Sequence, residues 1–414
     1  MSMLAACATS ADDEPSQPAA EPTEQEPAEE EDDAAEAEEE EPETADPGGE
    51  DGLAVNFSPA EERELLDQYD DWAEGGDAEW EALLEAARAE GEVVIASTPN
   101  PEFRRLVTSE FERDTGITVQ YLPNAVPAEI TGRLRQEAQA GNISVDVFLS
   151  GWPGVVDDLP GGLLRSLAPD LVLPSVLDQS AWRDGDLLWQ DADASHLLRL
   201  LLYVTGYPTV NTDHVDPASI QVWDDLLAPE LAGKIAQFDP RSPGPGSPAA
   251  VYMAVEMEEG WAQRYFEEQD PTFTRDQRQL ADWVAQGTYP VGLALDVSQT
   301  QQLRAAGFPL EAIFPTDAPG VLTSGFGILR LFDASPNPNA AAVFANWLAS
   351  PKGAMVMQLG LDQPSLRTDV EVTANIPREI LLQDDVEYLD QNTEEYVKSA
   401  MLPGHAILVE ILGR

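Results

Sequence analysis

The sequence predicts an α/β fold in two lobes, each a mostly parallel sheet flanked by helices, with a hinge of two segments between them. Strand and helix patterns alternate in two separate runs along the chain. Two extended apolar segments lie at the ends of the second run, where the chain passes between lobes. The part after residue 56 is also long enough for two domains of the usual size, roughly 100 to 200 residues each.

The first run begins in "DAEWEALLEAARAEGEVVIAS". Apolar side chains recur at i, i+3, i+4 and i+7 from Trp80, which predicts a helix that Asp77 caps and Gly91 ends. The apolar run "VVI" follows as a strand buried on both faces. Asn100 takes the N-cap position of a second helix, which ends at Gly116. A strand in "ITVQYL", a helix in "PAEITGRLRQEAQAG" and a strand in "VDVFLS" complete this run.

The second run has the same alternation of strands and helices, with different residues at the boundaries of the elements. "WDDLLAPELAGK" predicts a short helix. The predicted strands that follow are "IAQFDP", "YPVGLAL" and "LEAIFP". Two helices, "SPAAVYMAVEMEEG" and "RQLADWVAQG", lie between the first two strands, and the helix "SQTQQLRAAG" lies between the last two. The segments "LLRLLLYVTGYPTVN" and "SGFGILRLF" are the expected crossings. Two crossings of this kind make a hinge.

The charge of the chain is strongly negative and concentrated near the N-terminus. With 77 acidic and 22 basic residues the formal net charge is −55, which argues against binding to a nucleic-acid backbone. Residues 11–51 contain 20 acidic residues, and no Lys or Arg precedes Arg63. This composition predicts a disordered tether over residues 8–56, with a span of roughly 40 Å on the random-coil rule. Ca²⁺ binding is the alternative for such an acidic run.

Cys7 is the only cysteine, so no intramolecular disulfide can form. No run of about 18 apolar residues predicts a membrane span. The four residues "LAAC" that end at Cys7 resemble the lipobox of bacterial lipoproteins, which implies a signal remnant over residues 1–7 and a lipid on Cys7. Only three residues precede the box, whereas a signal needs a basic region and an apolar region. Either the start codon is placed too late or the match is by chance.

Several blocks together resemble the extracellular solute-binding proteins of ABC importers, in the two-lobed type 2 periplasmic-binding-protein group that includes the ferric-iron binders. They are "WEALLEAARAEGEVVIAS", "FRRLVTSEFERDTGITVQY", "AGNISVDVFLSG", "WDDLLAPELAGKIAQFDPRSPG" and "NPNAAAVFANWLASPKGAMVMQLGLDQPSLRTDV". The resemblance implies a monomer outside the cytoplasm that delivers a small solute to a permease and its ATPase. It covers roughly residues 77–414, and we expect lobe 1 over 57–197 and 325–414 and lobe 2 over 198–324.

In open α/β sheets, ligands lie beyond the carboxyl ends of the strands, where helix N-termini present free N–H groups. These strand ends and the second crossing give the predicted ligand-binding residues: Ser97, Thr98, Gly151, Trp152, Arg241, Ser242, Gly246, Ser247, Asp296, Ser298, Thr323 and Ser324. Each also has a structural explanation. Thr98 and Ser247 can cap helices, Asp296 can be a hinge or cap residue, and Thr323 and Ser324 can simply provide the bend at the second crossing. Trp152 can pack on the lobe edge, and the "RSPGPGSP" loop can be an ordinary connection or a backbone nest for an anion.

The ligand is expected to be a small organic anion, bound by hydroxyl and amide donors and by Arg241. The iron binders of the resembling group hold ferric iron with two adjacent tyrosines, a histidine and a glutamate. Here no Tyr-Tyr pair occurs, and where the pair would fall the chain reads "DVS" at 296–298. The three histidines, at 196, 214 and 405, are far apart and predict no metal site. Ferric iron held by other ligands is the alternative, and no cofactor is expected.

The sequence also bears on two other classes of function. The chain has no GxSxG elbow, P-loop, HExxH or Rossmann fingerprint, so an enzyme is not expected. Adjacent carboxylates such as Asp157-Asp158 or Asp384-Asp385 are typical of a solvated surface in so acidic a chain. A lipid-anchored sensor that presents its ligand to a receptor would use the same two lobes, and the sequence leaves it open.

Overall fold

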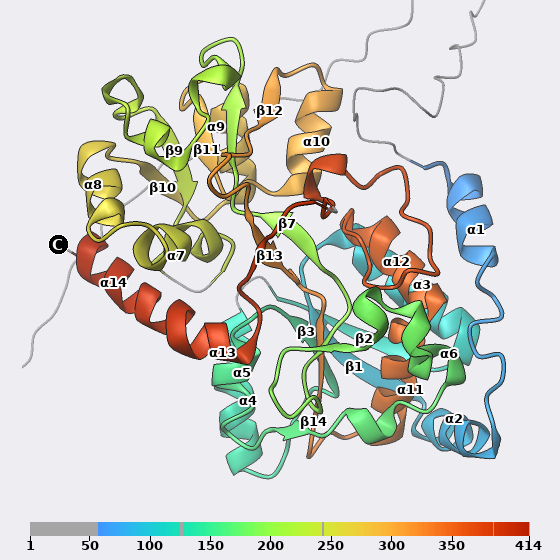
Figure 1. Ribbon diagram of the computed structural model, residues 1–414. Helices are drawn as coiled ribbons and strands as arrows, with labels where there is room; N and C mark the ends of the chain where they lie inside the picture. Colours follow the sequence, from blue (N-terminus) through green and yellow to red (C-terminus); the bar gives the residue numbers. More distant parts are fainter. Residues whose placement is uncertain (1–56, 125–126, 242–243, 384, 414) are drawn as a thin grey trace, which may run out of the picture. The chain divides into compact units, whose positions relative to one another are not determined.

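The computed structural model describes residues 57–413 except 125–126, 242–243 and 384, and for 127–129 it describes the backbone only. The expected acidic tether, the signal remnant, Cys7 and Ser242 lie outside these residues. Figure 1 shows the arrangement of the helices and strands.

The first helices begin and end at residues that the sequence indicates. Asp77 accepts hydrogen bonds from the N–H groups of residues 79 and 80 at the start of α2, and Asn100 does the same at the start of α3. Gly91 and Gly116 follow the two helices with φ of 83° and 76°, the left-handed region that favours glycine. The first elements are α1 (Pro59–Asp67), α2 (Ala78–Glu90), β1 (Glu92–Ser97), α3 (Pro101–Thr115), β2 (Thr118–Pro123) and α4 (Pro127–Gln139).

The larger sheet has seven strands in the order β2-β1-β3-β14-β6-β5, with β4 paired to β14. β1 pairs in parallel with β2 and β3, as the alternation predicts, whereas β14 and β6 add antiparallel neighbours. These added strands come from the crossing segments, which return to the sheet from the opposite direction. The strands are β3 (Val147–Ser150), β4 (Leu164–Arg165), β5 (Leu188–Trp189), β6 (Leu198–Arg199) and β14 (Ile328–Phe332).

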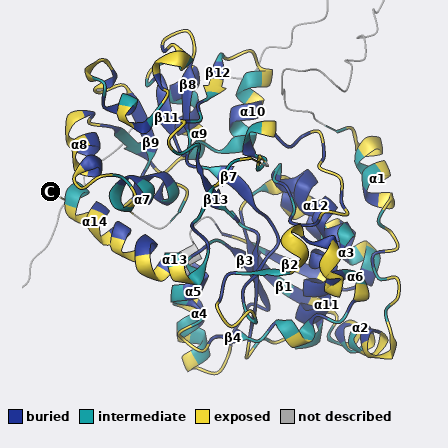
Figure 2. Ribbon diagram, viewed as in Figure 1, coloured by how far each residue is buried: buried dark blue, intermediate teal, exposed yellow. Residues whose placement is uncertain are grey.

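Alternate residues of β1 face two different hydrophobic clusters, as a strand with helices on both sides requires. Val93 and Ile95 are fully buried in the cluster that contains α2, α3 and two later helices, α11 (Pro338–Ala349) and α12 (Pro351–Leu361). Ala96 lies in the other cluster, with Leu134 of α4. Figure 2 shows the strands of this sheet buried and the outer faces of α2 and α4 exposed, whereas α11 and α12 are buried along almost their whole length.

The second sheet has five strands in the order β10-β9-β11-β8-β12, parallel over β10-β9-β11 and antiparallel over the rest. Its elements are β8 (Pro208–Asn211), β9 (Ile235–Phe238), α7 (Ser247–Val255), α8 (Trp261–Glu268), β10 (Thr272–Thr274), α9 (Gln277–Ala285), β11 (Val291–Leu293), α10 (Val297–Ala305) and β12 (Leu310–Ala312). The expected single helix in "WDDLLAPELAGK" is wrong. Two 3₁₀ turns, η5 (Trp223–Leu227) and η6 (Pro229–Leu231), stand there, because Pro229 forces Ala228 into an extended conformation.

A third sheet of three short strands contains parts of both crossing segments. β7 (Tyr203–Thr205) and β13 (Val321–Thr323) pair antiparallel, and β15 (Leu389–Asp390) pairs in parallel with β13. The sequence patterns did not indicate β15, which has only two residues. Short connecting elements complete this part of the chain: α5 (Gly154–Asp157), η1 (Ala168–Asp170), α6 (Pro174–Leu177), η2 (Gln179–Ala181), η3 (Arg183–Gly185), η4 (Pro217–Ser219) and η7 (Arg378–Ile380).

The last helical segment was also not predicted. It consists of α13 (Glu394–Tyr396), a π-helical turn η8 (Val397–Met401) and α14 (Leu402–Leu412). α14 packs along α7, and a Cβ on Gly404 would lie 2.8 Å from Val251, so only glycine permits this close approach. Among the described residues, no helix has both the length and the apolar composition to span a membrane.

Candidate functional site

The predicted residues at the end of β1 serve the local structure. Ser97 and Thr98 are both buried. The Thr98 Oγ1 accepts a hydrogen bond of 3.3 Å from the N–H of Asn100, and its carbonyl oxygen accepts one of 2.7 Å from the Tyr121 hydroxyl. The Thr98 hydroxyl therefore orders the turn before α3, whose N-cap is Asn100.

Trp152, after β3, is packed rather than open to solvent. Its side chain lies in the second hydrophobic cluster and stacks on His405 of α14, with ring centroids 5.6 Å apart. Burial lowers the pKa of His405, so this ring stays neutral near pH 7. The carbonyl oxygen of Gly151 accepts a hydrogen bond of 3.2 Å from the buried Arg330.

The loop after β9 holds the predicted anion-binding residues. The Arg241 guanidinium donates Nε–H and Nη2–H hydrogen bonds of 2.8 and 2.9 Å to both carboxylate oxygens of Asp239, which also pairs with Arg275. Despite the burial of Asp239, its hydrogen bonds with Arg241 and the charges of Arg241 and Arg275 lower its pKa. Ser247 is the first residue of α7, after the N-cap Gly246, and its Oγ accepts from the Gly244 N–H at 3.0 Å.

The predicted hydroxyls of the second crossing form hydrogen bonds with the backbone and with an arginine. The Thr323 Oγ1 accepts a hydrogen bond of 3.1 Å from the N–H of Gly325. The Ser324 Oγ is fully buried and accepts one of 2.9 Å from Arg199, whose guanidinium also pairs with Asp390. These residues fix the bend between β13 and β14.

Asp296 and Ser298 lie at the start of α10, beside the end of α12. Asp296 caps α10 by accepting a 3.0 Å hydrogen bond from the Gln299 N–H. Ser298 donates its hydroxyl to the carboxylate of Asp362, the C-cap residue of α12, and Asn375 donates to the same carboxylate. α10 packs beside the five-stranded sheet, and α12 lies against the seven-stranded sheet. These hydrogen bonds therefore connect a helix of one sheet to a helix of the other.

Burial raises the pKa of both Asp296 and Asp362. The negative charge of Asp362 raises the pKa of Asp296 further, whereas hydrogen bonds from Ser298 and Asn375 offset part of the rise at Asp362. Two neighbouring carboxylates thus lie where helices of the two sheets meet.

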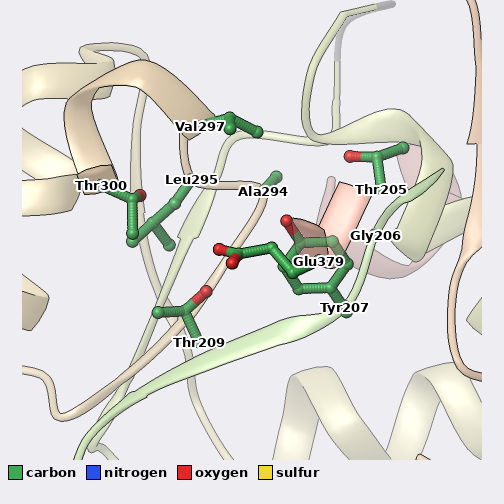
Figure 3. Close-up of a pocket in the computed structure, with 9 residues that line it drawn as sticks. All are labelled: Thr205, Gly206, Tyr207, Thr209, Ala294, Leu295, Val297, Thr300 and Glu379. Carbon is green, nitrogen blue, oxygen red and sulfur yellow. The ribbon is translucent and has the colours of Figure 1, made fainter. Parts of the chain in front are cut away.

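A small pocket lies next to Asp296. It has nine lining residues: Thr205, Gly206, Tyr207, Thr209, Ala294, Leu295, Val297, Thr300 and Glu379. They come from three separate stretches: the end of β7 with the connection into β8, the β11–α10 connection with the first turn of α10, and η7 (Figure 3). Its free volume is about 10 Å³, which is room for about one water molecule.

None of the predicted ligand-binding residues lines the pocket, although Asp296 stands between the lining residues Leu295 and Val297. Sequence reasoning followed the strand end after "VGLAL" to Asp296 but took "YVTGYPT" only as a crossing segment. The hydroxyl and aromatic side chains of that segment were the available signal.

Two features of the pocket wall are unusual. Ala294 has φ of 64°, a left-handed conformation that non-glycine residues rarely adopt and that is often found at functional sites. Glu379 forms an ion pair with Arg304 of α10, and both side chains are largely buried. Figure 3 shows the Glu379 side chain lying across the pocket in front of the Tyr207 ring. Burial, and to a lesser degree the charge of Glu379, raises the pKa of Tyr207, so its hydroxyl stays protonated.

The described residues contain no group of three or more His, Cys, Asp or Glu side chains that could hold a metal ion.

The model of the family "Bacterial extracellular solute-binding protein" matches residues 107–378. The chain belongs to this family. Solute-binding proteins of this kind bind small ligands outside the cytoplasm and work with ABC permeases, so the family and the fold are those of transport components. A comparison of the sequence with curated proteins gives no match.

Solved structures with the same fold are distant in sequence. AfuA from Actinobacillus pleuropneumoniae, with exogenous fructose-6-phosphate bound, is 18% identical, with a TM-score of 0.61 over 78% of this chain and 98% of AfuA. A periplasmic thiamin-binding protein is 14% identical, with a TM-score of 0.61 over 78% and 96%. Iron-bound HitA from Pseudomonas aeruginosa is 12% identical, with a TM-score of 0.60 over 77% and 99%. The two-lobed type 2 fold expected from the sequence is confirmed.

Proposed function

We propose that this solute-binding protein captures a small organic solute in the pocket of Tyr207 and Glu379, between its two lobes, and delivers it to an ABC permease and ATPase. The observation that carries the proposal is the composition of the pocket wall. Tyr207, Leu295 and Val297 come from segments next to the five-stranded sheet, whereas Glu379 comes from the segment after α12. A solute there would touch both parts at once.

The proposed mechanism is a population shift between open and closed lobes. The lobes are those expected from the sequence, 57–197 with 325–414 and 198–324. The pocket has room for only about one water molecule, so a larger solute requires its walls to separate and then close around it. A solute that contacts both walls only when they are closed biases that state, and the permease recognises the closed form.

The anchor is part of the same proposal. A lipid on Cys7 would hold a monomer at the outer side of the membrane, and the acidic residues 8–56 would serve as the tether. The high negative charge and low content of large apolar residues in this segment support a solvated spacer, because such a segment cannot bury enough apolar surface to form a core. Upstream codons for a basic and apolar signal would be needed for lipidation.

The distant relatives do not select the ligand, because one has fructose-6-phosphate bound, one is a thiamin-binding protein and one is iron-bound. The organic anion expected from the sequence relies on Arg241, whose guanidinium already pairs with Asp239. Ser97, Thr98, Gly151, Trp152 and the other strand-end residues remain candidates for an open state.

Native mass spectrometry of the chain, purified without denaturation from a cell extract, tests the proposal. We expect a small organic molecule to co-purify with the protein. The substitution Val297→Trp fills the pocket and should abolish the adduct, whereas Val372→Trp, at an exposed valine, should keep it. An adduct that persists unchanged in Val297→Trp would place the solute elsewhere, and no adduct under any condition would contradict solute capture.

A further inference from the structure

The pocket wall is rich in hydroxyl groups and has little charge. Thr205, Thr209, Thr300 and Tyr207 supply hydroxyls, and Glu379 is the one ionisable carboxylate among the nine lining residues. None of the nine is Lys, Arg or His. A pocket of this kind offers both donors and acceptors but no positive charge that could bind an anion directly.

The charge of Glu379 is already balanced. Arg304 forms an ion pair with it from α10, and Arg304 also donates a hydrogen bond of 2.9 Å to the carbonyl oxygen of Leu310. The Arg304 side chain is 13% exposed and that of Glu379 20%, so the pair is screened only weakly by solvent. A cationic solute would therefore have to displace Arg304 in order to pair with Glu379.

The groups around the pocket disfavour an anionic solute. Asp296 lies between two lining residues, and Asp362 is close enough for its charge to act on Asp296. These two carboxyls accept hydrogen bonds from the Ser298 hydroxyl, the Asn375 amide and the Gln299 backbone N–H. A phosphate or carboxylate in the pocket would stand beside the Glu379 carboxylate, whose negative charge opposes an anion and whose ion pair already engages Arg304.

The apolar part of the wall complements the hydroxyls. The Tyr207 ring, Leu295 and Val297 can cover the C–H face of a small carbon skeleton. The threonine hydroxyls and Glu379 can form hydrogen bonds with polar groups at the edge of that skeleton. A polyol or monosaccharide has both surfaces. Its hydroxyl groups would donate to the Glu379 carboxylate in hydrogen bonds that its charge strengthens.

We infer that the solute is an uncharged polyhydroxylated small molecule, such as a polyol or a monosaccharide, and that Glu379 determines this specificity. The inference rests on the proposed function. It differs from the organic anion expected from the sequence, because the positive charge of Arg304 is taken up by Glu379 and that of Arg241 by Asp239.

The test is a titration of the full chain with a panel of small polyols and monosaccharides, each beside its phosphate ester, its acid and its amine, followed by calorimetry and thermal shift. We expect binding of at least one neutral member and at least tenfold weaker binding of its charged forms. Tighter binding of a phosphate, acid or amine form would overturn the inference and leave solute capture standing. If no neutral member binds, the inference also fails, and the native mass measurement decides separately whether solute capture holds.

The variant Glu379→Gln separates specificity from folding. It removes the charge with little change of shape and releases Arg304, so we expect about tenfold weaker binding of the neutral solute and stronger binding of its phosphate ester. A merely structural role would weaken both or neither. Thr209→Val should weaken the neutral solute without strengthening the ester. Glu311→Gln, at an exposed residue of β12, is the matched control and should change neither.

Discussion

At the scale of single residues, the Asp296 and Asp362 carboxyls are the groups with the clearest electrostatic consequence. Both have raised pKa values, mainly because burial disfavours the ionised form. Asp362 also has φ of 54°, a left-handed conformation that Asp and Asn tolerate better than other non-glycine residues. Asn is therefore the substitution that keeps the backbone and removes the charge.

We expect Asp362→Asn to raise the free energy of unfolding at pH 7.5 by about 1 kcal/mol. In the wild type, the folded carboxyl binds a proton at a pH where the unfolded one does not, so this group adds stability as pH falls from the raised pKa toward about 3.8. The advantage of the variant should therefore shrink at pH 4.5. Urea unfolding at the two pH values measures both differences.

Asp213→Asn, at an exposed aspartate, is the control and should leave the free energy of unfolding nearly unchanged at both pH values. An advantage of Asp362→Asn that is equal at pH 7.5 and pH 4.5 would show that the pKa of Asp362 is not raised.

At the scale of elements, α1 is attached to the body of the protein by a buried lysine. The Lys352 ammonium is fully buried and donates hydrogen bonds of 2.7 Å to the Leu66 carbonyl oxygen and 2.9 Å to Asp70. It also lies 3.5 Å from Glu110, whose two carboxylate oxygens both accept hydrogen bonds from Arg63 of α1. This network holds the first helix after the acidic segment against α12.

Lys352→Met removes the positive charge, so the Leu66 carbonyl oxygen and the carboxylates of Asp70 and Glu110 lose this cationic partner. We expect a loss of about 3 kcal/mol in the free energy of unfolding, and faster hydrogen exchange in residues 59–70 than in α3. Lys234→Met, at an exposed lysine, should change neither quantity. Unchanged exchange in residues 59–70 of Lys352→Met would mean that other contacts hold α1.

The contact between α14 and α7 depends on Gly404. A Cβ there would lie 2.8 Å from Val251 and 2.9 Å from Val255, distances too short for carbon atoms without a shift of the helices. We expect Gly404→Ala to lower the free energy of unfolding by about 1 to 3 kcal/mol, measured by urea denaturation. Ala406→Leu adds a larger group on the exposed side of the same helix and should cost little. Equal effects of the two substitutions would contradict the close packing.

The helices that the sequence predicted best are those whose signals are local. Asp77 and Asn100 cap α2 and α3 because a side chain reaches the N–H groups two and three residues ahead, whatever the rest of the fold does. β15 and α14 were missed for the opposite reason. β15 has two residues and exists through its pairing with β13, and α14 carries a proline and a glycine that ordinarily indicate a boundary.

At the scale of the whole molecule, two runs of strand and helix patterns were sufficient to predict the fold, but not the pocket. Its wall joins Tyr207, Ala294 and Glu379, which are separated along the chain and follow no common pattern. Of the residues predicted from strand ends, Asp296 lies next to the pocket in the chain. The hydroxyls of Thr98, Ser247 and Ser324 instead form hydrogen bonds with the backbone or with an arginine. Only the fold shows which polar groups face a shared space.

The most direct test of solute capture between the lobes is a crystal structure of the full chain, purified without denaturation and without added ligand. We predict density for a small uncharged molecule in contact with Tyr207, Thr209 and Glu379, with helices α10 and α12 close together. A small molecule bound at a different place would contradict the account. An empty pocket in protein that mass spectrometry shows to contain a bound solute would also contradict it.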